Sequence, residues 1–282
     1  MALTASRYGK GRVRVMRLAR DGDHHTPREL TLEVLMTGDF DRAWTSGDNR
    51  LCVATDSVKN IVNVTAAKHV EADKEAFAGH VAAVFLDTYR QVHEISVEAR
   101  ETRWLRHTIA GTPHGHTFTL DGNGTGYVKL VASRAGSVLQ SGLRGYTFMK
   151  TTESGWADFV DDGYRTLPDT NDRIAATSMD ATWTWVAAPA DYAAANATVL
   201  ETLIAVFGTT YSPSVQDSMY RMGEAALAAV PEIAEIRFAM PNKHYIPINL
   251  SPFGLANDGE VFLPTDEPHG QIEATIGRSG PV

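Results

Sequence analysis

Alternation of apolar and polar residues is clearest near the start of the chain, where it predicts a β-hairpin. Leu30, Leu32, Val34 and Met36 alternate with polar residues, which is the pattern of a strand with one buried face. A similar alternating segment precedes them, and residues 21–27 between the two are dense in turn formers. The pair therefore predicts an antiparallel hairpin, with His24 and His25 solvated in its polar turn.

Helical spacing follows the hairpin. The segment from Val58 to Lys68 predicts a short helix, and a second helix ending near Val92 is predicted by an apolar stripe with i, i+4, i+7 and i+8 spacing. The residues of this stripe are Phe77, Val81, Val84 and Phe85. Strand-like alternation returns at residues 95–100 and 126–132, on either side of a turn-rich segment at 120–124.

The second half of the chain repeats this order. Strands are predicted at residues 142–150 and 181–187, and closing strands at 233–240 and 271–276. Between them the same apolar spacing, at Val199, Leu203, Val206 and Phe207, predicts one helix, and residues 214–229 predict another that ends before Pro231.

The predicted order ββααββ thus occurs in each half of the chain, which predicts an α+β protein with two copies of one unit. In each unit the helices pack on one face of an antiparallel sheet. We place the boundary near Ala135 and Gly136, which gives domains at 1–135 and 136–282. Because such units leave sheet edges without partners, we also expect oligomerisation.

Composition narrows the class of protein. With 282 residues, of which 43% are hydrophobic, the chain buries a large core. Its net charge of -8 and the lack of a Lys/Arg cluster argue against a nucleic-acid partner. The single cysteine, Cys52, lies in an apolar run, so an internal disulfide is impossible and a reducing compartment is favoured.

Neither a membrane span nor a targeting signal is predicted. No segment approaches the roughly 20 apolar residues of a membrane span, and the N-terminus has no hydrophobic signal region. The last residues also lack a peroxisomal tripeptide. We therefore expect a cytoplasmic protein with no membrane partner.

Short polar segments, widely separated in sequence, carry the candidate chemistry. Arg173 and Gln216 each offer a planar fork of hydrogen-bonding atoms, which matches the N–H and C=O edges of a purine-like ring. The ordinary alternatives are a surface ion pair between Asp172 and Arg173 and a solvent-facing first-turn position for Gln216. The sharper interpretation is a pocket for a flat, anionic heterocycle.

Two further segments offer proton-transfer groups. Lys10 is a solvated lysine by default, and a lysine becomes a base only if burial or a neighbouring cation lowers its pKa. Asp56 or Ser57, just before a predicted helix, would serve as an ordinary N-cap. The sharper hypothesis is that the Thr55 hydroxyl bridges Lys10 to a substrate.

Histidines supply the last candidates. Asn242 and His244 follow Pro241 where a strand is predicted to leave the sheet, and such strand-end loops often carry site residues. His107, His114 and His116 invite a metal interpretation, yet no cysteine or carboxylate ligand lies close by in sequence. A hydrogen-bonded turn between strands explains His114-Gly115-His116 equally well, so we predict no metal site.

Taken together, these segments resemble urate oxidase (uricase) over nearly the whole chain. The matching fragments are Tyr8-Gly9-Lys10, Thr55-Asp56-Ser57-Val58-Lys59-Asn60, Pro113-His114-Gly115-His116-Thr117-Phe118, Asp172-Arg173, Ser212-Pro213-Ser214-Val215-Gln216, Pro241-Asn242-Lys243-His244-Tyr245 and Pro268-His269-Gly270. The resemblance implies two tandem T-fold domains, assembled into a tunnel-shaped homotetramer with active sites at subunit interfaces. It also implies a urate:oxygen oxidoreductase that needs no metal or organic cofactor and uses O2 as co-substrate.

The resemblance further implies a role for each site residue. Arg173 and Gln216 hold the ring edge with help from the Val215 backbone, while Lys10, Thr55 and His244 relay protons. Asn242 and Thr55 frame the place above the ring where O2 or water sits. Lys10, Thr55, Asp56 and His244 of one subunit would face Trp156, Arg173, Val215, Gln216 and Asn242 of its neighbour.

One residue departs from the family pattern. The family usually stacks a phenylalanine on the urate ring, whereas the chain places Trp156 there, with Phe159 as the alternative. The competing functions are a related oxidised or alkylated purine oxidase, a metal- or Cys-dependent cyclohydrolase, and a purine- or pterin-binding protein without turnover. Cys52 in its apolar run and the weak histidine cluster argue against the cyclohydrolase.

Overall fold

The computed structural model describes residues 1–278, so the C-terminal tripeptide considered for peroxisomal targeting lies outside the described residues. The chain divides into two compact units, Met1–Gly142 and Leu143–Val282. Strand β7 (Gly136–Lys150) begins at the predicted boundary and runs from the first unit into the second. The division into domains 1–135 and 136–282 stays a prediction.

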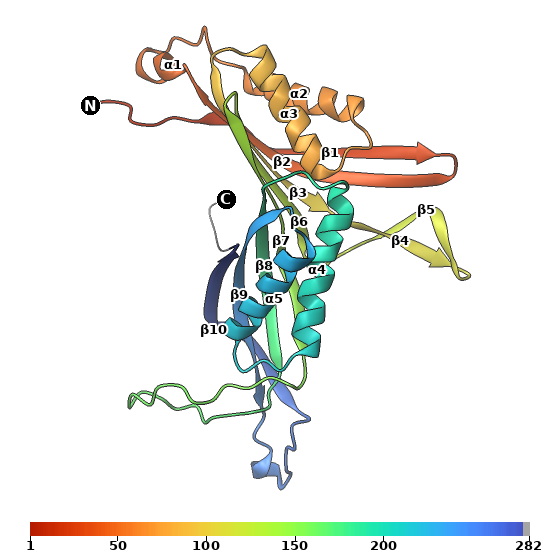
Figure 1. Ribbon diagram of the computed structural model, residues 1–282, viewed down its shortest axis with the longest axis vertical. Coiled ribbons are helices and arrows are strands. Elements are labelled where there is room, and N and C mark those ends of the chain that lie inside the picture. The colour runs from red at the N-terminus through yellow and green to blue at the C-terminus, as the bar shows by residue number, and fades with distance from the viewer. Residues whose placement is uncertain (279–282) are drawn as a thin grey trace. The chain divides into compact units, whose positions relative to one another are not determined.

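The first unit has four long strands with two long helices on one sheet face (Figure 1). Its sheet order is β1-β2-β3-β6, and the pairs β1–β2, β2–β3 and β3–β6 are antiparallel. The elements are β1 (Tyr8–Asp21), β2 (His24–Gly38), α1 (Asp41–Ser46), α2 (Thr55–Lys68), α3 (Lys74–Thr88), β3 (Val92–Thr102) and β6 (Thr125–Ser133). A separate hairpin of β4 (Trp104–Ile109) and β5 (Thr112–Leu120) projects as an arm.

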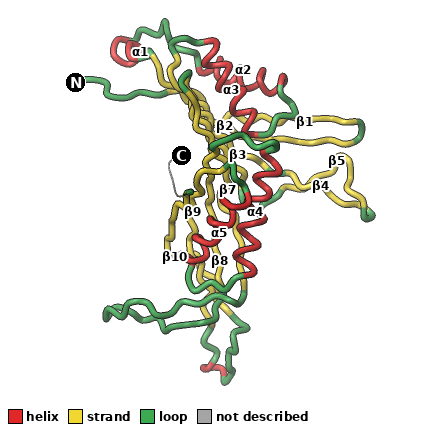
Figure 2. The backbone as a smooth tube through the Cα atoms, in the orientation of Figure 1, coloured by secondary structure: helices red, strands yellow, loops and turns green. Residues whose placement is uncertain are grey.

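The second unit repeats the plan, as the helix and strand colouring of Figure 2 shows. The C-terminal part of β7 is followed by β8 (Ala175–Trp185), α4 (Tyr192–Thr209), α5 (Val215–Ala229), β9 (Ile233–Pro247), the 3-10 turn η1 (Ser251–Phe253) and β10 (Phe262–Gly277). The sheet order is β7-β8-β9-β10, with β9 antiparallel to both of its neighbours. The predicted α+β class and the ββααββ order are confirmed.

The side chains predicted to face the core are mostly buried in the structure. The alternating residues of the first hairpin, Leu30, Leu32, Val34 and Met36, are all buried, as predicted. On α3 the apolar stripe is buried except at Val84, which is exposed. The prediction that this helix continues to about Val92 is wrong, because Val92 already begins β3. Arg134 ends the helix by donating hydrogen bonds to the carbonyls of Leu86 and Tyr89.

Each of the four longest helices, α2 to α5, ends against a basic side chain from the sheet. Arg17 on β1 donates to the carbonyls of His69 and Ala72 after α2, at 3.0 and 2.7 Å. Lys150 on β7 donates likewise to the carbonyls of Phe207 and Thr210 at the end of α4. A cation at a helix C-terminus satisfies open carbonyls and complements the helix dipole.

The remaining two helices are capped from the ends of the last strands of their units. Arg134, just after β6, caps α3, and Arg278, just after β10, donates to the carbonyls of Leu227, Val230 and Ile233 around the end of α5. The two units therefore share this capping scheme, although the two halves of the sequence show no convincing residue identity. The internal repeat is preserved in cap positions and in the order of the elements.

We expect Arg17→Met to be strongly destabilising. Arg17 is 3% exposed, and its guanidinium lies 4.2 Å from the centre of the Phe77 ring. Burial lowers the pKa of Arg17 to about 10, yet the group stays charged at neutral pH and bonds two carbonyls. Its loss should lower the free energy of unfolding by about 2 kcal/mol, measured by urea denaturation. Arg20→Met, at an exposed position of the same strand, should change it little; equal effects would contradict the capping role.

Candidate active site

Lys10 lies beside a β-bulge at the start of β1. The pairing of β1 with β2 shifts register between Lys10 and Val13, and Arg12 in this interval has a φ of 56°. Bulges bend a strand and re-aim neighbouring side chains. Lys10 itself is half-buried. Because of the bulge, Lys10 and Val13 lie on the same face of the sheet, whereas regular alternation would place them on opposite faces.

Gly9 is required where β1 approaches β2. A Cβ atom at Gly9 would lie 1.9 Å from the carbonyl oxygen of Val34. We expect Gly9→Ala to displace the start of β1, to destabilise the protein by about 2–3 kcal/mol and to lower any activity that depends on Lys10.

The matched control for Gly9 lies in helix α3. A Cβ at Gly79 meets no atom within 4 Å, so Gly79→Ala should stabilise the protein by about 0.5–1 kcal/mol. Thermal unfolding of the two variants tests the pair. A Gly9→Ala variant as stable as the wild type would contradict the close approach.

Thr55 and Asp56 are the first residues of α2, and both are exposed. The interpretation of Asp56 or Ser57 as the N-cap is wrong, because the N-cap is Ala54, which has no side-chain capping bond. The Asp56 carboxylate instead accepts hydrogen bonds from Lys59 at 2.6 Å and from Asn60 at 3.0 Å.

The Lys59 hydrogen bond is the main cause of the lowered pKa of Asp56, and the charge of Lys10 contributes as well. Both lysines thus favour the ionised form of the Asp56 carboxylate.

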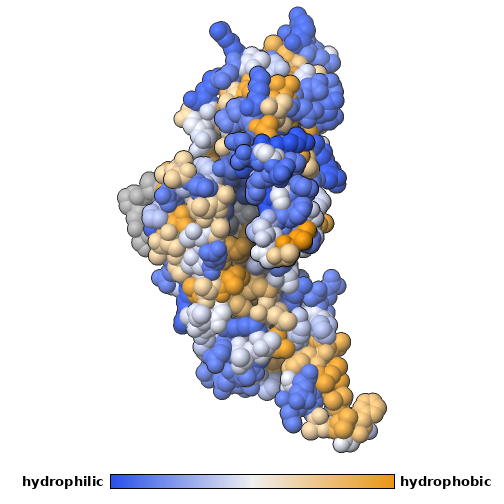
Figure 3. All heavy atoms as spheres, turned by 90° about the vertical axis from the view of Figure 1, so that its right-hand side faces the viewer, coloured by the Kyte–Doolittle hydropathy of each residue, from blue (hydrophilic) through white to orange (hydrophobic). Residues whose placement is uncertain are grey.

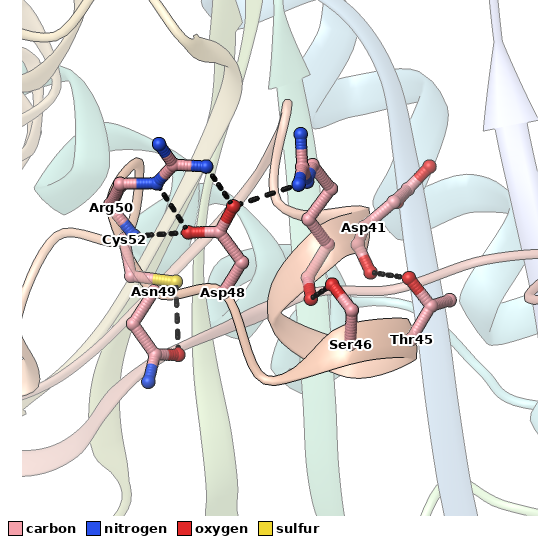
Figure 4. A network of polar contacts seen from close by, with 8 residues as sticks. Asp41, Thr45, Ser46, Asp48, Asn49, Arg50 and Cys52 are labelled. Carbon is pink, nitrogen blue, oxygen red and sulfur yellow. Dashed lines mark hydrogen bonds and ion pairs between the residues drawn. The ribbon is translucent and has the colours of Figure 1, made fainter.

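A polar network holds the segment that leads to Thr55 (Figure 4). The Asp48 carboxylate accepts hydrogen bonds from Arg50, at 2.8 and 2.6 Å, and forms an ion pair with Arg42. The Arg50 bonds lower the pKa of Asp48. Further along the segment, the Val53 N–H donates to the Tyr8 hydroxyl oxygen at 2.7 Å. Since burial raises the pKa of Tyr8 to about 12, this hydroxyl stays neutral and ties the start of β1 to the segment before α2.

Arg173 is a partly buried cation in the second unit. Its Nε donates to the Gly155 carbonyl at 3.2 Å, and burial lowers the pKa of the guanidinium. The ordinary alternative, a surface ion pair with Asp172, is not formed: Asp172 accepts from Thr152, and Arg173 donates to Gly155. Among the described residues the two terminal nitrogens of Arg173 have no hydrogen-bond or ion-pair partner. That edge of the guanidinium is available to a planar anion.

The segment between β7 and β8 brings Trp156 and Arg173 beside the α4–α5 connection. Trp156 and Thr170 exchange backbone hydrogen bonds of 2.7 and 2.9 Å, which closes this segment on itself. Gly155 N–H donates to the Ser212 carbonyl at 2.8 Å. A Cβ at Gly155 would lie 2.3 Å from the Tyr211 hydroxyl and 3.0 Å from the Thr170 carbonyl oxygen, so a larger residue would displace the Tyr211 side chain. Arg173 is thereby held next to the start of α5.

Val215 and Gln216 are the first two residues of α5. The N-cap Ser214 accepts a hydrogen bond from Asp217 N–H, but first-turn N–H groups such as that of Val215 have no acceptor within the helix. Gln216 is exposed, in agreement with the ordinary first-turn interpretation of its position. A helix start next to Arg173 favours negative charge.

The rings of Trp156 and Phe159 stack on each other, with centres 5.3 Å apart and planes 17° apart. The Arg165 guanidinium also lies 4.0 Å from the centre of the Phe159 ring. Phe159 thus has two stacking partners of its own, whereas Trp156 adjoins Gly155, to which Arg173 bonds. This arrangement favours Trp156 as the ring that meets a ligand, and the assignment stays a prediction.

Asn242 and His244 lie within β9 and not in a loop after it, so that part of the prediction is wrong. The strand continues because β10 pairs with it at both positions, through Gly270 and Thr265. On its other side Asn242 lies opposite Thr177 of β8. Since alternate residues of a strand share a face, Asn242 and His244 point to the same side of the sheet.

The histidine cluster differs from expectation. His114 and His116 are inside strand β5 and not in a turn, and their rings are 4.6 Å apart. His25, expected in a solvated turn, is within β2 and its ring lies 5.8 Å from His116. His107 instead bonds the Thr119 hydroxyl at 2.6 Å. Within residues 1–278 there is no group of three or more His, Cys, Asp or Glu side chains arranged to hold a metal ion.

Comparison with known proteins identifies the family. The sequence profile of uricase matches residues 6–130 and 139–273, which are nearly the whole of both units. The chain belongs to the uricase family. Uricases are oxidoreductases, so the protein is an enzyme, and the two-unit arrangement is the T-fold of that family.

Individual uricases match over nearly their whole length. The chain is 37% identical to the uricase of Aspergillus flavus, with 99% of this chain and 97% of that protein covered. It is 34% identical to the uricase of Oryctolagus cuniculus over 96% of this chain and 93% of that protein. The crystal structure of uricase from Arthrobacter globiformis superposes with a TM-score of 0.94 at 35% identity, covering all of this chain and 96% of the other. No helix among the described residues is long and apolar enough to cross a membrane.

The structure adds contacts that the sequence did not reveal. Tyr8 connects two segments of the first unit, and the Gly155 carbonyl accepts a hydrogen bond from Arg173. Ser154 and Thr177 are buried polar residues beneath the site residues of the second unit. A serine or threonine inside an ordinary strand or loop carries no pattern of its own, so only the three-dimensional arrangement reveals them.

Proposed function

We propose that the protein is a urate oxidase that converts urate, O2 and water to 5-hydroxyisourate and hydrogen peroxide without a metal or organic cofactor. Atoms balance in this reaction, because one oxygen from water enters the ring and O2 leaves as peroxide. The observation that carries the proposal is the partly buried Arg173, whose terminal nitrogens have no hydrogen-bond or ion-pair partner among the described residues. Membership of the uricase family supports the same substrate.

The proposed roles follow the chemistry of each group. Arg173 and Gln216 form paired in-plane hydrogen bonds with the ring edge, the Val215 N–H adds a third, and the Trp156 indole stacks on the ring face. A planar anion held in this way has a fixed orientation towards its reaction partners.

Proton transfer is assigned to the other set of residues. The Thr55 hydroxyl takes a proton from urate and passes its own proton to the Lys10 amine, with His244 behind the pair and Asp56 in the same first turn of α2 as Thr55. The more electron-rich anion then reacts with O2 in the space framed by Thr55 and Asn242. Exclusion of bulk water strengthens every electrostatic contact in such a site.

We further propose that two subunits of a homotetramer complete each site. Exposed apolar side chains around the β9–β10 connection, including Phe253 at 77% and Leu255 at 60% exposure, support an additional contact between copies. Figure 3 shows apolar spheres gathered at the projecting end of this connection. Sedimentation or light scattering tests the assembly. A cytoplasmic location stays a prediction.

A direct assay tests the function. Purified protein in air-saturated buffer should remove the ultraviolet absorbance of urate and form hydrogen peroxide in equal amount, with unchanged rate after treatment with a metal chelator. Urate binding without turnover would support the binding-protein alternative, and faster turnover of an alkylated or related oxidised purine would support the related-oxidase alternative. Loss of activity on chelation, restored by zinc, would instead favour a metal-dependent enzyme.

A further inference from the structure

A small cavity lies beneath the start of α5, inside the second unit. Its volume open to a water-sized sphere is about 10 Å³. Its lining includes four buried hydroxyl residues, Ser154, Thr177, Ser212 and Ser218, with exposures between 1% and 4%. A cavity needs roughly 10–15 Å³ by this measure to hold one water molecule. The space therefore matches a single water in size.

Two of the hydroxyl groups that line the cavity lack hydrogen-bond partners. The Oγ of Ser154 and the Oγ1 of Thr177 are buried and have no partner among the described residues. Ser212 and Ser218 hydroxyls lie 2.7 Å apart, and this pair retains a free acceptor position. Leaving buried hydroxyls unpaired is costly, whereas one water donates two hydrogen bonds and accepts two.

Thr177 connects this cavity to Asn242. The two residues are opposite each other on the antiparallel strands β8 and β9, so their side chains share one face. On the other side of Asn242 the register partner is Gly270, which has no side chain. The Oδ1 of Asn242 is also buried without a partner among the described residues.

We propose that the cavity binds one structural water, and that Thr177 with this water is a positioning device for Asn242. The Thr177 hydroxyl donates a hydrogen bond to the water, and the water donates onward to Asn242 Oδ1, which keeps Oδ1 inward and presents the Nδ2 donors outward. The same water links Ser154, two residues before Trp156, to the serines around the start of α5. One buried molecule thus connects three segments that carry proposed site residues.

This inference deepens the proposed function, in which the Asn242 amide faces the oxygen-binding space. A fixed donor at that place stabilises negative charge as O2 is reduced. Loss of the device should therefore slow turnover while the ring grip, supplied by other residues, remains. The expected signature is a lower kcat with little change in KM for urate.

The structural test is a crystal structure of the wild-type protein at high resolution. We expect electron density for one water within hydrogen-bond distance of Ser154 Oγ and Thr177 Oγ1. A dry cavity would overturn the proposal. This result does not depend on activity, so it is distinct from a failure of urate oxidation by the wild type, which would reject the proposed function and leave the water site standing.

The kinetic test compares variants at one buried position. Thr177→Val should lower kcat about tenfold and leave KM for urate within about twofold, while Thr177→Ser, which keeps a hydroxyl, should restore most of the rate. Thr182→Val makes the same change on the opposite face of β8 and should leave kcat unaltered. If Thr177→Val fails to fold, Ser154→Ala probes the same water with the same expected kcat effect. A wild-type kcat in a folded Thr177→Val or Ser154→Ala variant would count against the positioning role.

Discussion

Arg173→Ala is expected to abolish urate binding. The guanidinium is partly buried and its Nε is anchored to Gly155, so its remaining nitrogens are oriented before a ligand arrives. Removing it would leave one edge of a buried anion unpaired, at a cost of roughly 2–5 kcal/mol. We expect kcat/KM to fall at least about 100-fold, together with loss of binding of an unreactive purine analogue measured by titration calorimetry.

Two further variants define what Arg173 contributes. Arg173→Lys retains the charge but not the planar fork, so it should recover only a small part of the affinity. Arg237→Ala removes a guanidinium that is paired with Glu273 on the sheet, and it should leave binding unchanged. Analogue affinity in Arg173→Ala within a few-fold of the wild type would reject Arg173 as the ring-binding residue.

The periodic parts of the fold were predictable because burial repeats along the chain. Leu30 and Val34 reveal the buried face of β2 by simple alternation, and Val199 and Leu203 do the same for α4. Non-periodic features were not predictable in this way. The capping of α2 by Arg17 joins residues more than 50 positions apart, and no local pattern reports such a contact.

Pro241 explains why part of the site was misplaced. Proline normally marks the end of a strand, so residues after it were assigned to a loop. In the structure β9 continues because β10 still pairs with it, with Gln271 opposite Pro241. On the β8 side the pairs pass from Thr177–Asn242 to Asp180–Ala239, so the missing N–H of Pro241 breaks no pair with β8. The residue types of the candidate site were recognisable from sequence, but their backbone setting was not.

The bulge beside Lys10 illustrates the same limit. Tyr8-Gly9-Lys10 was singled out by resemblance, yet the sequence does not show that the register shifts immediately afterwards. Nor does it show that Tyr8 bonds Val53, two residues before Thr55. The Tyr8–Val53 hydrogen bond thus joins the strand that carries Lys10 to the segment that precedes α2. This connection gives a physical reason to test Lys10 and Thr55 as a functional pair.

Lys10→Met and Thr55→Ala should each slow turnover far more than they weaken binding. Both act on proton removal in the proposed mechanism, whereas the ring is held by Arg173 and Gln216. General acid–base groups typically contribute 100-fold or more, so we expect kcat to fall about 100-fold with KM for urate within a few-fold. Stopped-flow absorbance with urate in excess separates the two parameters.

Comparison of the single and double variants decides whether Lys10 and Thr55 act together. The double variant should be little slower than either single variant, because residues that act as one unit are not additive. Lys68→Met removes an exposed lysine from the end of α2 and controls for the change in net charge. Wild-type turnover in a folded Lys10→Met variant would show that another group removes the proton.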